Sequence, residues 1–334
     1  MGSDPWVCPQ NTGDNLTAKP LMLVMLPDSK VFREGLEKAG IASRYEIADV
    51  APGTKPDADK LARAEVVLAM AAPPGLLAEM PKLKWVQAMT VGVDQWLTRK
   101  DLSPKHVLTA ARGTHRVQMP ENILGALFHI TKKYHQIELA QKDAKWARSM
   151  STLIAGKTLG ILGLGSVGQE LAKKAEALEM RVIGTKRTGG HVPHVAKVYA
   201  PGEVDQVLAE SDFVVLLLPV TPETENMINA ARIARMKKDA WLINFARGAL
   251  IVDDDLIAAV KARTIAGAVL DVFRTEPLPT EHPFWRTPGI SVLPHIGGLH
   301  PTRDRMVSEL FTENAKRYLA GEPLREAVDR ARGY

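Results

Sequence analysis

The stretch TLGILGLGSVG, residues 158–168, decides the predicted fold of this 334-residue chain. It begins with the apolar run typical of a buried β-strand, and apolar residues at helical spacing follow it. Between them, Gly163, Gly165 and Gly168 match the pattern G-x-G-x-x-G. The first glycine permits a tight turn, the second lets a pyrophosphate approach the backbone, and the third lets the helix pack close to the strand. We therefore predict a dinucleotide-binding turn of the Rossmann type, against the alternative of an ordinary strand–turn–helix.

The start of the helix after this turn is predicted to hold the phosphates of a cofactor. Backbone N–H groups point out of a helix N-terminus, and the helix dipole favours negative charge there. The cofactor-binding residues predicted in the turn are Gly163, Leu164, Gly165, Ser166, Val167 and Gly168.

The next predicted strand, 181–184, bears on which nicotinamide cofactor binds. NAD-binding folds usually carry an acidic residue about 20 residues after the glycines, where it bonds the ribose hydroxyls. No acidic residue occurs from 180 to 202, and the strand is followed by Lys186, Arg187 and Thr188. Two cations and a hydroxyl would bind a 2′-phosphate through charge-assisted hydrogen bonds. We expect NADP(H) to be preferred and NAD(H) to be possible, unless this segment is only a polar surface turn.

Strand-like runs alternate with helical segments in two regions, 21–110 and 158–293. This alternation predicts two parallel sheets with helices on their faces, and several of the runs are apolar throughout, as strands buried on both faces are. A helix is predicted from just after His115 to about Ala147, and a last helix from about Thr302 to Ala320. The expected fold class is α/β, with two doubly wound sheets.

Composition excludes several other classes of protein. The net charge of +5 is spread along the chain, and the longest apolar run, Phe213–Leu218, is far shorter than the roughly 20 residues that span a membrane. The single cysteine, Cys8, excludes an intrachain disulfide and a cysteine-rich zinc site, so we predict no metal. The N-terminus does not match a signal peptide. We expect a cytoplasmic protein that binds neither nucleic acid nor membrane.

Three residues that follow predicted strands in the second region could carry chemistry: Arg247, Glu276 and His295. Ligands of open parallel sheets bind beyond the carboxyl ends of the strands. A histidine there could protonate the alkoxide formed when a hydride adds to a ketone, and a carboxylate on its other ring nitrogen would fix the tautomer. An arginine fork could bind the carboxylate of a 2-keto acid. Taken singly each residue is more often structural, but their common placement favours a catalytic site.

In this order the motifs resemble the D-isomer-specific 2-hydroxyacid dehydrogenase family. The resemblance covers the chain from about Leu21 onward. It rests on GKTLGILGLG (156–165), LPVTPET (218–224), NFARG (244–248), LDVFRTEP (270–277) and PHIGG (294–298).

The resemblance implies a role for each of the three residues that follow strands. Arg247 is expected to bind substrate, His295 to be the general acid and base, and Glu276 to be the partner of His295. The family also implies cofactor contacts from Leu218, Pro219 and Asp271, with Asp271 near the nicotinamide carboxamide.

A further loop, containing Val91 and Gly92, is similar to the family loop whose backbone N–H groups hold the substrate carboxylate. A plain helix start is the alternative interpretation of that loop.

The family architecture implies a Rossmann cofactor domain inserted into a flavodoxin-like substrate domain. The expected boundaries are a flexible N-terminal extension at 1–20, a substrate domain at 21–115 and 300–334, and a cofactor domain at 116–299. The resemblance also implies a homodimer, with the helix from Pro120 and the arm near Trp146 at the interface.

The segment HPFW, residues 282–285, is similar to the NADPH-dependent glyoxylate/hydroxypyruvate reductase branch of the family. The expected activity is therefore reversible reduction of a small 2-keto acid to the D-2-hydroxy acid. The segment QMPEN, residues 118–122, is an unusual version of the inter-domain helix start, so the substrate stays open. A nucleotide-sensing interaction protein on the same scaffold, like the C-terminal-binding corepressors, is the alternative function.

Overall fold

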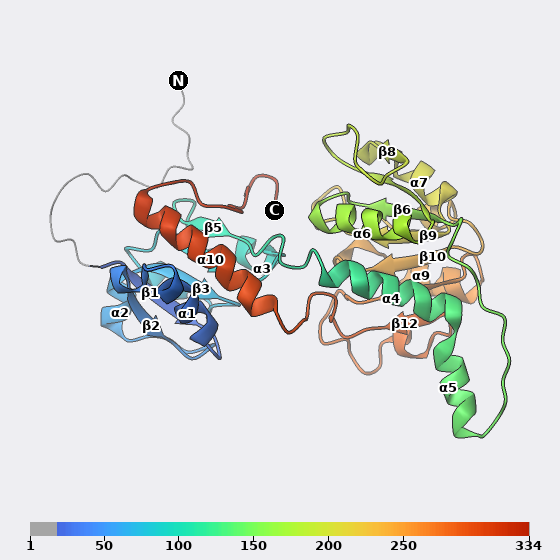
Figure 1. Cartoon of the computed structure of the whole chain (residues 1–334), viewed down its shortest axis with the longest axis horizontal. Coiled ribbons are helices and arrows are strands. Elements are labelled where there is room, and N and C mark those ends of the chain that lie inside the picture. The colour runs from blue at the N-terminus through green and yellow to red at the C-terminus, as the bar shows by residue number, and fades with distance from the viewer. Residues whose placement is uncertain (1–18, 334) are drawn as a thin grey trace. The chain divides into compact units, whose positions relative to one another are not determined.

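The structure is a computed structural model that describes residues 19–333. The chain divides into two compact units, shown in Figure 1. Unit 1 holds the described residues up to Thr114 and those from His300 on, and unit 2 is His115–Leu299. Each unit is built on one sheet, and all strand pairs in both sheets are parallel. The predicted α/β class with two parallel sheets is confirmed. Cys8 and nearly all of the predicted extension lie outside the described residues.

The sheet of unit 1 has five strands in the order β2-β1-β3-β4-β5. The strands match short apolar runs of the sequence, and β1, β3 and β4 are almost fully buried because helices cover both faces. The strands are β1 Leu21–Met25, β2 Glu46–Asp49, β3 Ala64–Ala69, β4 Trp85–Ala88 and β5 Val107–Thr109, and the α-helices are α1 Lys30–Lys38, α2 Ala58–Arg63, α3 Asp94–Leu97 and α10 Arg303–Ala320.

The C-terminal helix α10 belongs to unit 1 because aromatic side chains attach it to the sheet. Phe311 lies with its ring centroid 5.3 Å from that of Trp85 on β4 and 6.1 Å from that of Phe32 on α1. Asn314, fully buried, donates to the carbonyl of Arg325 and accepts from its N–H, at 3.0 and 2.7 Å. These bonds hold the chain that follows α10 against the same unit.

The sheet of unit 2 has seven strands in the order β12-β11-β10-β9-β6-β7-β8. The first of these strands in the chain, β6, lies in the interior of the sheet. The strands β7 and β8 then follow on one side of β6, and β9 to β12 follow on the other side. The strands are β6 Thr158–Leu162, β7 Arg181–Thr185, β8 Lys197–Tyr199, β9 Phe213–Leu216, β10 Trp241–Asn244, β11 Gly267–Leu270 and β12 Ile290–Val292, and the α-helices are α4 Gln118–Lys132, α5 Tyr134–Lys142, α6 Ser166–Ala177, α7 Val204–Glu210, α8 Ala230–Ile233 and α9 Asp253–Lys261.

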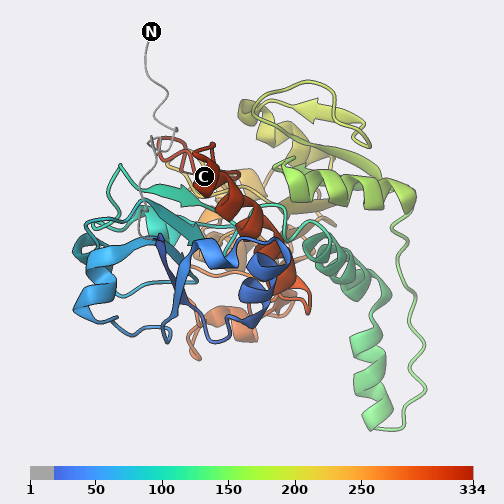
Figure 2. The same ribbon diagram turned by 60° about the vertical axis from the view of Figure 1, so that its left-hand side comes forward.

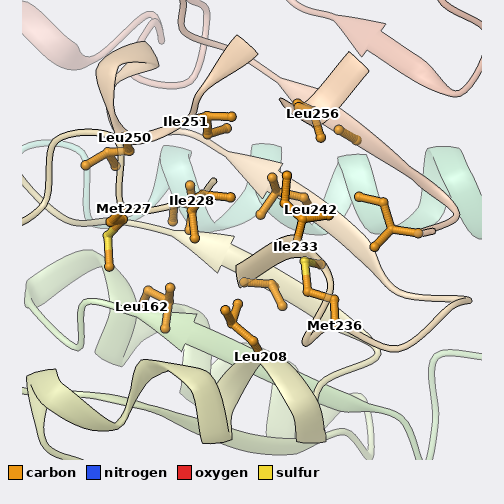
Figure 3. Close-up of a cluster of buried hydrophobic side chains, with 14 of the residues drawn as sticks. Leu162, Leu208, Met227, Ile228, Ile233, Met236, Leu242, Leu250, Ile251 and Leu256 are labelled. Atoms are coloured by element: carbon orange, nitrogen blue, oxygen red, sulfur yellow. The ribbon is translucent and has the colours of Figure 1, made fainter. Parts of the chain in front are cut away.

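Apolar side chains fill both faces of this sheet. One cluster joins β-strand residues such as Leu162 and Leu242 to the helices and loops on one face, where Leu208 and Leu256 contribute (Figure 3). A second cluster on the other face joins α4 and α6 to the alternate residues of the same strands. The carboxyl edge of the strands is thereby supported from both sides.

The predicted long helix after His115 was wrong in its second half. The helix breaks at Lys133, which adopts a left-handed conformation with φ +57°, and α5 then ends at Lys142 rather than near Ala147. None of the residues of α5, all of which the structure describes, is buried, so no packing face extends the helix. Figures 1 and 2 show α5 and the segment after it projecting from the body of unit 2.

Within residues 19–333, no helix combines the length and the apolar character needed to cross a bilayer.

Candidate functional site

Arg247, Glu276 and His295 come from three neighbouring strands of one sheet. They follow β10, β11 and β12, which lie side by side in unit 2 and run parallel. Parallel strands end at the same edge, so the three turns meet beyond the carboxyl edge of the sheet, which is where open α/β sheets bind ligands. The Gly-rich turn after β6 lies at the same edge of the same sheet.

The imidazole of His295 is bonded to the carboxylate of Glu276. Nδ1 of His295 lies 2.6 Å from Oε2 of Glu276, and the side chains are 51% and 33% exposed. The other carboxylate oxygen, Oε1, accepts the backbone N–H of Phe273 at 2.8 Å. Glu276 is therefore fixed to its own turn by one oxygen and holds the histidine with the other. Because Nδ1 donates to the carboxylate, Nε2 is the ring nitrogen left to exchange protons with a ligand.

The backbone at His295 is left-handed, with φ +52°, which is uncommon for a residue with a side chain. Two side chains hold the segment after it. Asp271, 1% exposed, accepts the N–H groups of Ile296 and Gly297 with its two oxygens, both at 2.8 Å. From α4, Nδ2 of Asn122 donates to the carbonyls of the same two residues at 3.3 and 3.1 Å. Three successive peptide groups, from His295 to Gly298, are held by these bonds, and the conformation of His295 is fixed with them.

The two glycines after Ile296 let this clamp close. A Cβ on Gly297 would lie 2.6 Å from the ring of Phe245 and 2.7 Å from Oδ2 of Asp271. A Cβ on Gly298 would lie 2.4 Å from the imidazole of His115. The segment after β12 therefore packs directly on Phe245, which follows β10 and lies two residues before Arg247.

The turn that carries Arg247 is shaped by a buried amide. Asn244, fully buried at the end of β10, accepts the N–H of Ala246 at 3.0 Å and donates to the carbonyl of Arg247 at 2.8 Å. The guanidinium of Arg247 is half-buried and donates to the carbonyl of Ala246 at 2.6 Å. Asn244 thus fixes the backbone from which Arg247 extends.

The geometry of the Gly-rich turn suits a dinucleotide. Gly163 has φ +112°, and a Cβ there would lie 2.7 Å from the carbonyl oxygen of Leu217, next to Leu218. A Cβ on Gly168 would lie 2.4 Å from the carbonyl oxygen of Gly163, so only glycine lets α6 start this close to the strand. Gly165 is exposed, with open space where its side chain would be, immediately before the first residue of α6. A phosphate could approach the backbone there.

Leu218 and Pro219 follow β9 and are half-buried beside the Gly-rich turn, against which Leu218 packs. Their predicted contact with a cofactor stays a prediction.

The turn after β7 presents the cations predicted to meet a 2′-phosphate. Lys186 is half-buried, whereas Arg187 and Thr188 are exposed. Hydrogen bonds from Thr221 and its own backbone, together with the charge of Arg187, lower the pKa of Glu223. The positive charge of Arg187 therefore reaches the loop after β9. Glu223 thus places a carboxylate within the electrostatic reach of Arg187, although β7 itself contains no acidic residue.

Val91 and Gly92 lie in unit 1, in the bend between β4 and α3. The hydroxyl of Thr90 donates to the carbonyl of Gly92 at 2.6 Å and fixes this bend. The helix α3 begins two residues later, at Asp94. The predicted role of the loop in binding a substrate carboxylate stays a prediction.

Comparisons with known proteins agree with this architecture. The model of the family described as D-isomer specific 2-hydroxyacid dehydrogenase, NAD binding domain, matches residues 124–297. An uncharacterized protein from the proB 3′ region of Corynebacterium melassecola is 32% identical over 270 residues, which is 78% of this chain and 88% of that protein.

Solved structures of similar proteins cover both units. A D-isomer specific 2-hydroxyacid dehydrogenase from Xanthobacter autotrophicus Py2, in complex with NADPH and MES, is 29% identical with a TM-score of 0.83, covering 95% of this chain and 100% of that one. An NADPH-dependent glyoxylate/hydroxypyruvate reductase from Sinorhizobium meliloti, in complex with NADP and sulfate, gives the same identity, TM-score and coverage. The chain belongs to the D-isomer specific 2-hydroxyacid dehydrogenase family.

Two residues that support the site, Asn244 and Asn122, were not found from the sequence. Asn244 gave a usable signal, because a polar residue that ends an apolar strand is commonly there for its hydrogen bonds. Asn122 gave none, because it lies 174 positions before Ile296 in the chain. The cofactor contact predicted for Asp271 stays a prediction; in the structure both of its oxygens accept N–H groups of the segment after His295.

Asp271→Asn tests the clamp. The amide offers one acceptor in place of two, and its NH2 group then faces a backbone N–H. We expect the free energy of unfolding to fall by roughly 1–3 kcal/mol, measured by urea unfolding. The same change at the exposed Asp239 should alter it by less than about 0.5 kcal/mol. An equal effect at both positions would contradict the clamp.

The clamp also has a pH dependence of known sign. Burial raises the pKa of Asp271 above its ordinary value of 3.8, while the N–H groups of Ile296 and Gly297 oppose the shift. A raised pKa means that the folded protein binds the proton of Asp271 more tightly than the unfolded chain does. Protonation of Asp271 therefore stabilises the fold. This stabilisation is complete below the ordinary pKa and is lost as the pH rises through the raised pKa. The stability advantage of the wild type over Asp271→Asn should therefore be larger near pH 4 than near pH 7.

Proposed function

We propose that this protein reduces a small 2-keto acid to the D-2-hydroxy acid, reversibly, with a nicotinamide cofactor. The observation that carries the proposal is the bond between His295 Nδ1 and Glu276 Oε2, at the edge of the sheet that also bears Arg247 and the Gly-rich turn. The cofactor, when bound, supplies the hydride in reduction and accepts it in oxidation.

His295 is the proposed general acid and base. Addition of a hydride to a keto carbon leaves an oxyanion, which must be protonated before the product leaves. The cationic ring can donate that proton from Nε2 while Nδ1 stays bonded to Glu276. In oxidation, the neutral ring accepts the hydroxyl proton at Nε2. Glu276 serves both directions because it fixes the tautomer and the ring orientation.

Arg247 is the proposed binder of the substrate carboxylate. A guanidinium presents two parallel N–H donors that match a carboxylate, and its charge also polarises the adjacent carbonyl. Val91 and Gly92 are proposed to bind a substrate carboxylate through their backbone N–H groups. Glyoxylate and hydroxypyruvate are the proposed substrates, supported by the similarity to the Sinorhizobium meliloti reductase.

His295→Ala tests the role of the histidine. Loss of a general acid should lower kcat by about 10²- to 10⁴-fold with glyoxylate or hydroxypyruvate, while the Kd for NADPH stays within about twofold. Turnover is followed by cofactor absorbance, and cofactor binding by the quenching of protein fluorescence. The exposed His191→Ala serves as the control and should retain full activity. If His295→Ala turns over like the wild type, the proposed role is wrong.

NADPH is the proposed cofactor. Support comes from Lys186, Arg187 and Thr188 after β7, and from the NADPH and NADP in the complexes of the Xanthobacter autotrophicus and Sinorhizobium meliloti proteins. The proposed phosphate site is this turn, and the cofactor contacts proposed for Leu218, Pro219 and Asp271 complete the set.

The double variant Lys186→Ser, Arg187→Ser separates the two cofactors. Only NADPH carries the 2′-phosphate, so its KM should rise roughly 10- to 100-fold, which corresponds to the loss of charge-assisted hydrogen bonds, while the KM for NADH changes little. Initial rates with both cofactors measure this difference. Equal weakening of both would place the 2′-phosphate elsewhere.

We also propose a homodimer formed through α5 and the segment after it. Large apolar side chains are exposed there, among them Leu139, Trp146 at 92% and Met150 at 89%. A patch of this kind is uncommon on a monomer surface and is typical of an interface.

The single cysteine favours a reducing compartment, and we propose a cytoplasmic location for the protein.

Charge placed on this arm should dissociate the dimer. The variant Leu139→Arg, Trp146→Arg buries two cations in the proposed interface without altering a buried residue of unit 2. We expect sedimentation velocity to give a dimer for the wild type and a monomer for the variant. Met70→Arg, on an exposed apolar residue of unit 1, should remain dimeric. A wild type that sediments as a monomer would contradict the proposal.

A further inference from the structure

Arg274 joins three segments that surround the site without itself carrying the chemistry. Its guanidinium donates to Oδ1 of Asn226 and to the carbonyl of Ile251, and lies 3.4 Å from the carbonyl of Ala249. Asn226 lies in the loop between β9 and α8, and Ala249 and Ile251 follow the turn that carries Arg247. Arg274 itself lies two residues before Glu276. One side chain therefore connects the loop after β9, the Arg247 turn and the Glu276 turn.

The backbones of the Arg247 and Glu276 turns also meet at this point. A Cβ on Gly248 would lie 2.0 Å from the carbonyl carbon of Phe273 and 2.3 Å from the nitrogen of Arg274. The residue after Arg247 thus rests on the peptide between Phe273 and Arg274. Phe273 connects this peptide to the preceding one, whose N–H, on Phe273 itself, donates to Oε1 of Glu276 at 2.8 Å. A displacement of the backbone at Phe273 therefore also displaces the carboxylate that holds His295.

Asp253, the first residue of α9, forms an ion pair with Arg274. Nε of Arg274 lies 3.6 Å from Oδ1 of Asp253, and Nε2 of His282 lies 3.5 Å from Oδ2. Nδ1 of His282 accepts the N–H of Phe284 at 3.3 Å, so its proton is on Nε2, toward Asp253. Both side chains therefore turn an N–H group toward the carboxylate of Asp253.

Burial raises the pKa of Asp253, and the charge of Arg274 is the largest influence that opposes the shift. A half-buried carboxylate of this kind is costly without a cationic partner. Each partner thus supports the other: Asp253 restrains the guanidinium, and the charge of the guanidinium favours the ionised form of Asp253.

We propose that Arg274, held by Asp253, is a positioning residue that sets the orientation of His295 through the turn of Glu276. This inference rests on the proposed function, because it concerns the same histidine. Arg274 acts through the backbone at Phe273, whose N–H binds Oε1 of Glu276, and keeps it in the place from which Glu276 reaches Nδ1. Partners that orient such groups typically contribute about 10- to 100-fold to activity.

The test is Arg274→Gln, with Arg181→Gln as the matched control. Arg181 is also paired with a carboxylate in unit 2, at 3.1 Å from Glu210, but at the start of β7 and so at the opposite edge of the sheet. Two readouts are needed. The first is the 15N spectrum of the His295 ring at alkaline pH, assigned with His295→Asn. The second is kcat and KM with NADPH and glyoxylate.

In the wild type and in Arg181→Gln, the neutral ring of His295 should carry its proton on Nδ1. In Arg274→Gln a mixture of tautomers should replace this form, and kcat should fall about 10- to 100-fold while the Kd for NADPH stays within about twofold. Unchanged tautomer and unchanged kcat would overturn the inference. A fall in kcat with the Nδ1–H tautomer fully retained would also overturn it, because the effect would then bypass Glu276.

Asp253→Asn provides a second variant that keeps the shape of the residue. It should shift the tautomer in the same direction and by a smaller amount, because the bonds from Arg274 to the two carbonyls remain. If Arg274→Gln does not fold, this variant decides the question by the same two readouts. The NMR readout needs no substrate, so a wild type that fails to turn over any 2-keto acid would refute the proposed function and still leave the positioning role tested.

Discussion

The bond between Glu276 and His295 is the constraint on which the rest of the site depends. It joins two residues from the ends of neighbouring strands, so it can form only if β11 and β12 are parallel, adjacent and correctly registered. The parallel sheet supplies that condition, because its strands all end at one edge. The Gly-rich turn and the Arg247 turn reach the same edge for the same reason. One sheet therefore brings together all the groups of unit 2 that are proposed to bind the cofactor and substrate or to transfer the proton.

Sequence motifs predicted the parts of the site that are local. A strand followed by glycines, or by a single arginine or histidine, is visible within ten residues, and the fold class follows from the alternation of such strands with helices. Contacts that depend on tertiary packing were not visible. Asn122 reaches the segment after His295 from a helix far earlier in the chain, and the break at Lys133 depends on the lack of a packing surface for α5.

The placement of Asp271 shows why a motif identifies a residue more readily than its partner. The sequence position, directly after a buried strand and among family motifs, predicted Asp271 as part of the site. Its two oxygens meet backbone N–H groups 25 and 26 residues later, and those donors are oriented by the left-handed backbone at His295. Side-chain identity can be read in the sequence, whereas the direction in which backbone groups point is decided only when the segments meet.

The exposure of the two central residues explains why so much buried structure supports them. His295 must be open to a ligand for its proposed role, and a hydrogen bond or ion pair between exposed side chains is by itself weak, about 0–1 kcal/mol, and free to rearrange. A defined orientation must therefore come from groups that water does not reach. Asp271 and Asn244, both buried, supply such groups and fix the backbones on either side. The partly exposed pair of Arg274 with Asp253 adds a restraint on the turn of Glu276. In this fold the exposed side chains of the turns are the groups proposed to carry the chemistry, and the buried polar residues beneath the turns determine the orientation of those side chains.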